Sequence, residues 1–90
     1  MAFRGLSPLK WSRDVSEGYI NISVAILRKF QPHELKQAIV ALQTVQREIR
    51  QVIPEEQDYD TARKKNFRTQ NVNRALLVIQ NFIKHRRIHI

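Results

Sequence analysis

Lysine and arginine are concentrated in the last third of this sequence, and among its residues they are the best suited to bind a partner. Residues 61–90 carry eight basic side chains and no acidic one, whereas residues 1–60 carry eight of each, so the formal net charge of +8 belongs to the last third. Such side chains neutralise phosphates and release their counterions. We therefore expect nucleic acid or another polyanion to bind there. The candidate binding residues are Arg63, Lys64, Lys65, Arg68, Arg74, Lys84, Arg86 and Arg87.

Amide side chains lie between these cations and favour nucleic acid over a face that is simply solvated, because asparagine and glutamine can hydrogen-bond to base edges. The amides are Asn66, Gln70, Asn71, Asn73 and Asn81. No glycine-containing turn joins two short helices, however, so a helix-turn-helix motif is not indicated. Phe67 is the one aromatic candidate for stacking on a base. A basic helix face that contacts only water explains the charge pattern equally well.

Apolar residues outside the main helical seams support an alternative function in protein interaction. The alternative is a helical adaptor, or a subunit of a larger complex, that docks on an acidic protein. A homodimer is expected on the same grounds, because the first helix carries more apolar surface than one neighbouring helix covers. An anionic membrane surface ranks lowest, since the third helix uses its apolar face for the core. The candidate interface residues are Trp11, Ile20, Val24, Leu27 and Val40.

Catalysis, cofactor binding and metal binding are not expected. The chain has no cysteine, which excludes a thiolate zinc site and a cysteine nucleophile. Both of its glycines are isolated, so no phosphate-binding loop is indicated. His33 has no local partner for acyl transfer. His85 and His89 share one helix face, but two ligands among basic neighbours are too few for a functional metal site.

Length and composition indicate one small domain over residues 1–90. The hydrophobic fraction of 42% is too high for a disordered basic tail, and only two glycines and three prolines argue against a β-sandwich or barrel. No apolar stretch matches a secretory signal or a membrane span. Because cysteine is absent as well, a reducing compartment such as the cytoplasm is expected.

The N-terminal third is expected to form an arm followed by a first helix. Residues 1–11 hold several large apolar side chains, so they should pack over a gap between helices or, alternatively, dock on a partner. Ser12 can cap a helix near residues 13–30. Between Tyr19 and Ile26 the alternation of apolar and polar residues is also typical of a strand. Helix is favoured there because no second segment could pair with a lone strand.

The clearest helical signal predicts a second helix near residues 32–53. Pro32 suits the first position of a helix, and Glu34 lies in the first turn, where the helix dipole favours a carboxylate. Pro54 ends the pattern. Between these signals, apolar residues recur at alternating spacings of three and four, which is typical of a buried helical seam. The seam consists of Leu35, Ala38, Leu42, Val45, Ile49 and Val52.

A third helix is predicted near residues 61–86, after an acidic loop in which Asp58 or Asp60 can serve as its cap. It should run into a basic tail at residues 84–90. Its core stripe consists of Val72, Leu76, Ile79 and Ile83. The sequence therefore predicts an all-α fold, namely a three-helix bundle with an N-terminal arm.

Overall fold

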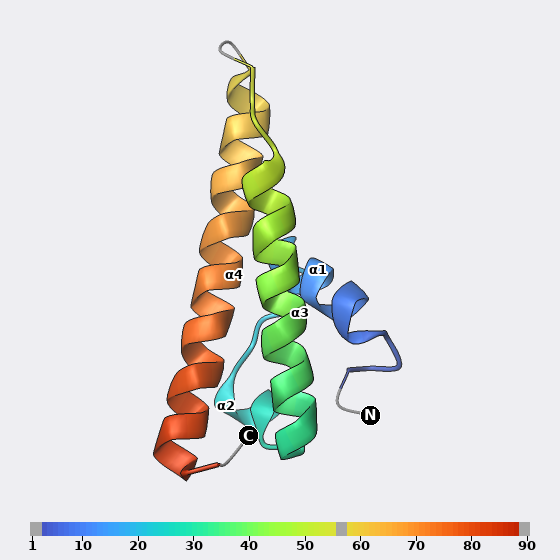
Figure 1. The fold of residues 1–90 in the computed structure, drawn as a ribbon, viewed down its shortest axis with the longest axis vertical. Coiled ribbons are helices and arrows are strands. Elements are labelled where there is room, and N and C mark those ends of the chain that lie inside the picture. The colour runs from blue at the N-terminus through green and yellow to red at the C-terminus, as the bar shows by residue number, and fades with distance from the viewer. Residues whose placement is uncertain (1–2, 56–57, 89–90) are drawn as a thin grey trace.

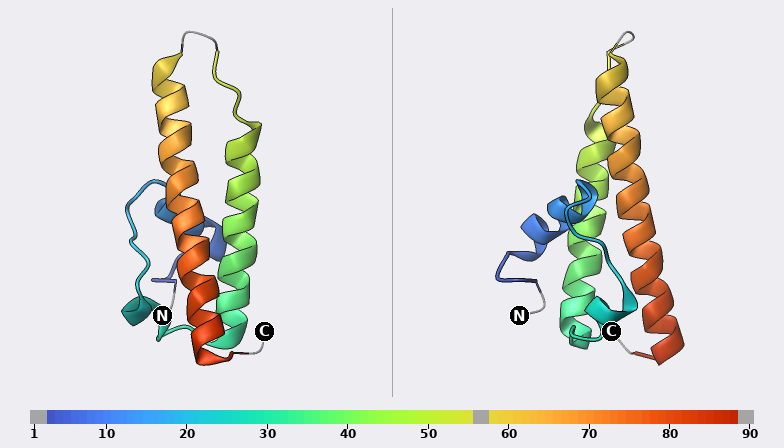
Figure 2. Two further views of the ribbon diagram at one scale, coloured as in Figure 1. Left: turned by 90° about the vertical axis from the view of Figure 1, so that its left-hand side faces the viewer. Right: turned by 180° about the vertical axis from the view of Figure 1, so that it is seen from behind.

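The all-α class is confirmed by the computed structural model, which describes residues 3–55 and 58–88. Helix accounts for 73% of the described residues, and none of them forms a strand. The helices are α1 (Pro8–Ser16), α2 (Val24–Leu27), α3 (Pro32–Gln51) and α4 (Tyr59–Arg86). The long helices α3 and α4 lie side by side as an antiparallel hairpin, and α1 crosses it near the middle (Figure 1). The short α2 lies at the end of the hairpin where α3 begins and α4 ends (Figure 2).

Helix α3 begins where the sequence predicts it and ends slightly earlier. Pro32 occupies the first turn, and the Glu34 carboxylate accepts a hydrogen bond of 2.9 Å from the backbone N–H of Gln31. The predicted seam is buried from Leu35 to Ile49. Val52 adopts extended backbone and is partly exposed. Pro54 disfavours helical conformation at Ile53, the residue before it, so the helix does not continue to residue 53.

Helix α4 is also confirmed, with its start two residues before the predicted one. Asp58 is the cap, since its side chain accepts a 3.0 Å hydrogen bond from the backbone N–H of Thr61. The helix ends at Arg86, and Arg87 follows in the left-handed conformation with φ of 52°. Val72 and Ile79 are fully buried on the stripe that faces the core.

The predicted helix at 13–30 is wrong, because two local signals divide that part of the chain. Ser7 and not Ser12 is the N-cap of α1, with its hydroxyl accepting a 3.2 Å hydrogen bond from the backbone N–H of Lys10. Pro8 then stands at the first helical position, where proline is favoured. The predicted arm therefore becomes helical before residue 11, and Ser12 lies buried inside α1.

Gly18 ends α1 in a C-terminal capping motif that the sequence reasoning missed. Its φ of 84° places it in the left-handed region, which glycine adopts without steric cost. The N–H of Tyr19 donates to the carbonyl of Asp14 at 2.9 Å, and the N–H of Gly18 donates to that of Val15 at 3.1 Å. This pair of bonds defines a Schellman motif, so the chain turns away from the helix axis at residue 18.

The segment from Tyr19 to Ser23 is neither helix nor paired strand. Ile20 is buried, Asn21 is exposed and Ile22 is half-buried, so the apolar alternation reflects an extended connection with one side against the core. Helix resumes only for the four residues of α2, where Ser23 is the cap. The expectation of a continuous helix through this stretch is therefore wrong, because residues 19–23 are not helical.

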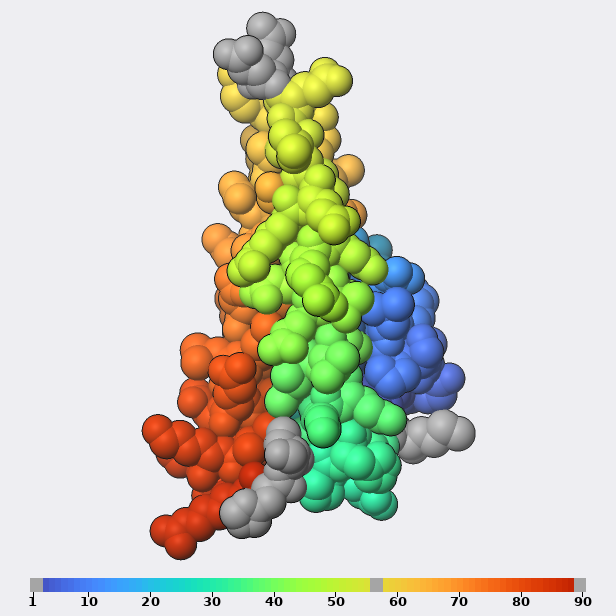
Figure 3. Space-filling view, in the orientation of Figure 1, coloured from blue at the N-terminus to red at the C-terminus, as the bar shows by residue number. Residues whose placement is uncertain are grey.

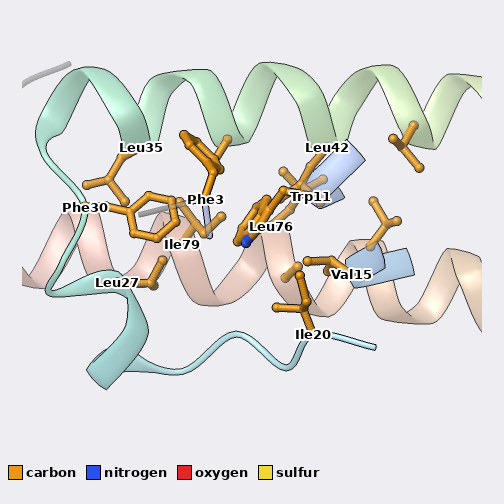
Figure 4. Packing of buried hydrophobic residues seen from close by; sticks show 14 of the residues in the cluster. Phe3, Trp11, Val15, Ile20, Leu27, Phe30, Leu35, Leu42, Leu76 and Ile79 are labelled. Atoms are coloured by element: carbon orange, nitrogen blue, oxygen red, sulfur yellow. The ribbon is translucent and has the colours of Figure 1, made fainter. Parts of the chain in front are cut away.

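Three aromatic rings join the N-terminal segments to the hairpin. The centroids of Phe3 and Trp11 are 5.3 Å apart, and those of Phe3 and Phe30 are 5.0 Å apart, both in edge-to-face arrangements. Trp11 and Phe30 also lie within 5.6 Å. The three side chains are buried between the two long helices beside Leu35, Leu42 and Ile79 (Figure 4). Edge-to-face pairs add about 0.5–1.5 kcal/mol beyond burial, so this cluster anchors α1 and α2.

The substitution Gly18→Ala tests the turn after α1. A Cβ atom at this position would lie 3.2 Å from Cζ of Phe67, in addition to the strain of a positive φ. We expect Gly18→Ala to lower the free energy of unfolding by about 1–2 kcal/mol from strain alone, with a further loss from the contact. Urea denaturation measures the effect.

Gly5→Ala is the matched control, because Gly5 has φ of 76° and no atom within 4 Å of the added Cβ. It carries the strain without the contact. Equal losses in the two variants would show that Phe67 yields freely and does not hold the turn.

Candidate functional site

The eight basic residues of the last third do not form one continuous patch. Helix α4 contains 28 residues, which corresponds to a length of about 40 Å at 1.5 Å per residue. Four of the cations stand in its first three turns and three at its end, with Arg74 between the two groups. The first group is Arg63, Lys64, Lys65 and Arg68, and the last is Lys84, Arg86 and Arg87.

The group at the start of α4 is partly neutralised within the molecule. Nε of Arg68 lies 2.6 Å from a carboxylate oxygen of Glu17, and both side chains are partly buried. Lys64, Lys65 and Arg68 line a mixed-charge groove of about 380 Å³ together with Glu17 and apolar residues of α3. A cation that already faces a carboxylate has less to gain from a phosphate, so this group is the weaker candidate site.

Asp58 adds a negative charge at the same end of α4. Hydrogen bonds from the Thr61 hydroxyl and then from the Thr61 backbone hold the pKa of Asp58 below its ordinary value of 3.8, and the charge of Lys64 acts in the same direction. The carboxylate therefore stays ionised at neutral pH and reduces the local positive potential.

The end of α4 lies beside basic residues from the first half of the chain. Helix α2, the start of α3 and the end of α4 occupy the same end of the molecule in every view (Figures 1 and 2). Six exposed cations gather on these segments, and we call them the basic end. They are Arg28, Lys29, Lys36, Lys84, Arg86 and Arg87.

One carboxylate, Glu34, belongs to the described residues of the same segments, and it is engaged in the cap of α3. Sequence reasoning missed Arg28, Lys29 and Lys36, because they belong to the first sixty residues, whose charges cancel in total. A count over short windows would have flagged Arg28 and Lys29 but not their proximity to α4.

Apolar packing holds the basic end in place. Leu27 and Phe30 are buried against the core on one side, and Phe82 and Ile79 of α4 are buried in the same cluster. The guanidinium of Arg86 lies 5.5 Å from the ring centroid of Phe82, which is within the range of a cation–π contact. The cations therefore project from a fixed scaffold.

Two of the five amides predicted to read bases are engaged inside the molecule. Nδ2 of Asn71 donates a 2.9 Å hydrogen bond to the carbonyl of Ser16, and Oδ1 of Asn73 accepts one of 2.8 Å from Gln46. Phe67 stands against Gly18 and is half-exposed, so part of its ring is already covered. Asn66, Gln70 and Asn81 are exposed.

Three of the five candidate interface residues lie in the core of the single chain. Trp11, Ile20 and Leu27 are buried, whereas Val24 and Val40 are exposed. A second apolar stripe of the N-terminal third, Ile20, Val24 and Leu27, is thus covered by the chain itself except at Val24, so most of it no longer argues for a dimer. Val40 remains as an exposed apolar residue on α3.

The remaining chemistry-bearing residues are dispersed. His33 is exposed near the start of α3, and His89, half of the histidine pair considered for a metal, lies outside the described residues. Within residues 3–55 and 58–88, no three histidine, aspartate or glutamate side chains stand close enough to hold a metal ion. No helix in the same ranges combines the length and apolar character needed to cross a bilayer.

No family model, curated protein or solved structure matches this chain. Its function must therefore be inferred from its own residues.

The pH dependence of stability tests the cap formed by Asp58. Because its pKa is lower in the folded state, the cap contributes fully above pH 3.8 and is lost as the pH falls through the folded value. Asparagine also caps helices but does not titrate. We expect the wild-type chain to lose more unfolding free energy than Asp58→Asn when the pH is lowered from neutral to below 3.8. Urea denaturation at both pH values measures it, and equal losses would contradict the assignment.

Proposed function

We propose that the chain is a non-catalytic binding module that engages nucleic acid or another polyanion through its basic end. The observation that carries the proposal is the gathering of six exposed cations on segments whose described residues carry one carboxylate side chain, Glu34, which already caps a helix. Three separate stretches of the chain supply these cations, so a local composition bias does not account for the cluster.

The size of the basic end suits an extended ligand. The molecule measures 26 by 19 Å across its long axis, and duplex DNA carries one negative charge per about 1.7 Å of its own axis. Such a duplex therefore presents more phosphates across this end than six cations can neutralise.

The proposed mode of binding is contact with the phosphate backbone. Asn71 and Asn73 are engaged within the molecule, and Arg86 stands over Phe82. Among the five candidate amides, Asn81 alone is both exposed and near the basic end, and phosphate contacts alone carry no sequence information. We therefore expect binding that depends strongly on salt and weakly on sequence.

Removing four cations from the basic end tests the proposal. The variant replaces Arg28, Lys29, Lys84 and Arg87 by glutamine and retains Arg86 because of its packing on Phe82. If each lost cation removes one phosphate contact, the slope of log K against log salt should flatten by roughly 3–4 units, at about 0.9 per contact on duplex DNA. Fluorescence anisotropy with a labelled DNA duplex across a salt series measures both affinity and slope.

A second fourfold variant separates the site from the total charge. Arg47, Arg50, Arg63 and Lys64 are equally exposed and lie toward the other end of the hairpin. Their replacement by glutamine removes the same charge and should leave most of the salt slope in place. Equal effects of the two variants would show that binding depends on the net charge of the chain and not on the position of the cations. Absence of binding by the wild-type chain at moderate salt would favour the adaptor for an acidic protein instead.

A further inference from the structure

The tip of the α3–α4 hairpin carries apolar side chains that no other described element covers. Ile53 is 86% exposed, more than any other large apolar residue of the described chain, and Tyr59 is 73% exposed. The hairpin extends well past α1 at this end, so no other element reaches the tip (Figures 1 and 3). Acidic residues accompany the apolar ones. We use the term hairpin tip for Val52, Ile53, Glu55, Asp58, Tyr59 and Asp60.

A groove that carries a positive charge, in contrast to the acidic tip, lies beside the first part of α3. It runs between the first turn of α1 and the outer side of α3, with a volume of about 640 Å³ and a mainly apolar lining. Val40, one of its lining residues, is 54% exposed. Its charged and titratable lining residues are His33 and Lys36, and no carboxylate lines it.

The carboxylates nearest to this groove in the sequence are already engaged. Asp14 accepts a hydrogen bond of 2.8 Å from Nζ of Lys10. Glu48 lies 3.2 Å from Nη2 of Arg13, and Glu34 caps α3. The groove therefore offers an apolar floor and a positive rim to an occupant from outside.

We propose that the hairpin tip of one copy docks into the α1–α3 groove of a second copy. The described residues of the tip carry apolar and acidic side chains, and the groove has a mainly apolar lining that includes Lys36. In the contact, Ile53 and Tyr59 cover Val40 and the other apolar lining, while the tip carboxylates face Lys36. Complementary charge of this kind selects the orientation of an encounter.

The chemistry of the groove favours a second copy over a polyanion. A phosphate backbone offers no apolar group to cover Val40, whereas the hairpin tip offers both apolar and acidic groups. Val40 and Ile53 are also thirteen residues apart, or about 20 Å at helical rise. Two antiparallel copies therefore bring each tip to the groove of the other, and this reciprocal contact closes a symmetric dimer.

Sedimentation equilibrium of two single variants and their mixture tests the proposal. Val40→Glu blocks the groove and Ile53→Glu blocks the tip, and both positions are exposed enough for the fold to tolerate the change, which circular dichroism checks. We expect the wild-type chain to form a dimer that weakens as salt rises, and each variant alone to dimerise at least about ten-fold less tightly. Leu77→Glu is the matched control, because Leu77 is 58% exposed on α4 and lies in neither surface.

The mixture of the two variants gives the decisive result. The Val40→Glu chain retains an intact tip and the Ile53→Glu chain an intact groove, so the mixture should associate more tightly than either variant alone. A failure of the mixture to recover association would overturn the tip-in-groove contact. A wild-type chain that stays monomeric at all concentrations would also overturn it and would leave the groove to a different protein. Ile53→Glu lies at the hairpin tip, far from the basic end, and should leave polyanion binding by the monomer unchanged, so this variant separates the test from that of the proposed function.

Discussion

The apolar seam between α3 and α4 is the contact on which every other part of the molecule depends. Two antiparallel helices cannot bury an apolar stripe by themselves, because each leaves one side of the seam open to water. The first thirty residues close that side with short pieces, namely α1, an extended connection and α2. Trp11, Phe3 and Phe30 fill the space between the helices and are almost fully buried. Loss of the aromatic cluster would therefore expose the seam itself.

The segments that cover the seam reach only part of the hairpin. The residues on the core-facing stripe of α4 change at the point where this cover ends. At 100° per residue, Thr61, Lys65 and Arg68 continue the same stripe as Val72 and Ile79. Where α1 covers the seam the stripe is apolar, and beyond α1 it becomes polar with long aliphatic stems. Such side chains can cover apolar surface while their charged ends reach water or a carboxylate. Arg68 does this in its contact with Glu17. The uncovered part of the hairpin thus stays folded without a third helix.

Two surfaces of different chemistry, the basic end and the hairpin tip, lie at opposite ends of the hairpin. At one end α2 brings Arg28 and Lys29 to the last turns of α4, where the helix dipole also favours cations. At the other end the acidic loop caps α4 and leaves Ile53 exposed. The long axis of 45 Å keeps these surfaces apart by several Debye lengths at physiological salt. Lys36, however, belongs both to the basic end and to the proposed docking groove, so a docked tip would compete with a polyanion for this one cation.

Local sequence determined the long elements of this protein, because their signals act within a few residues. The seam from Leu35 to Ile49, the proline at the start of α3 and the cap at Asp58 were all predictable, and so was the all-α class. The N-terminal third was misassigned because the helix start at Ser7–Pro8 and the helix end at Gly18 stand against a helical pattern of isoleucines. Which of these signals prevails is decided by tertiary packing, namely the burial of Ile20 and Leu27. The basic end could not be predicted either. Residues 28 and 84 are brought to one end of the molecule by the reversal of the chain between α3 and α4 and by apolar contacts of Leu27 and Phe82, and no local pattern encodes such long-range packing.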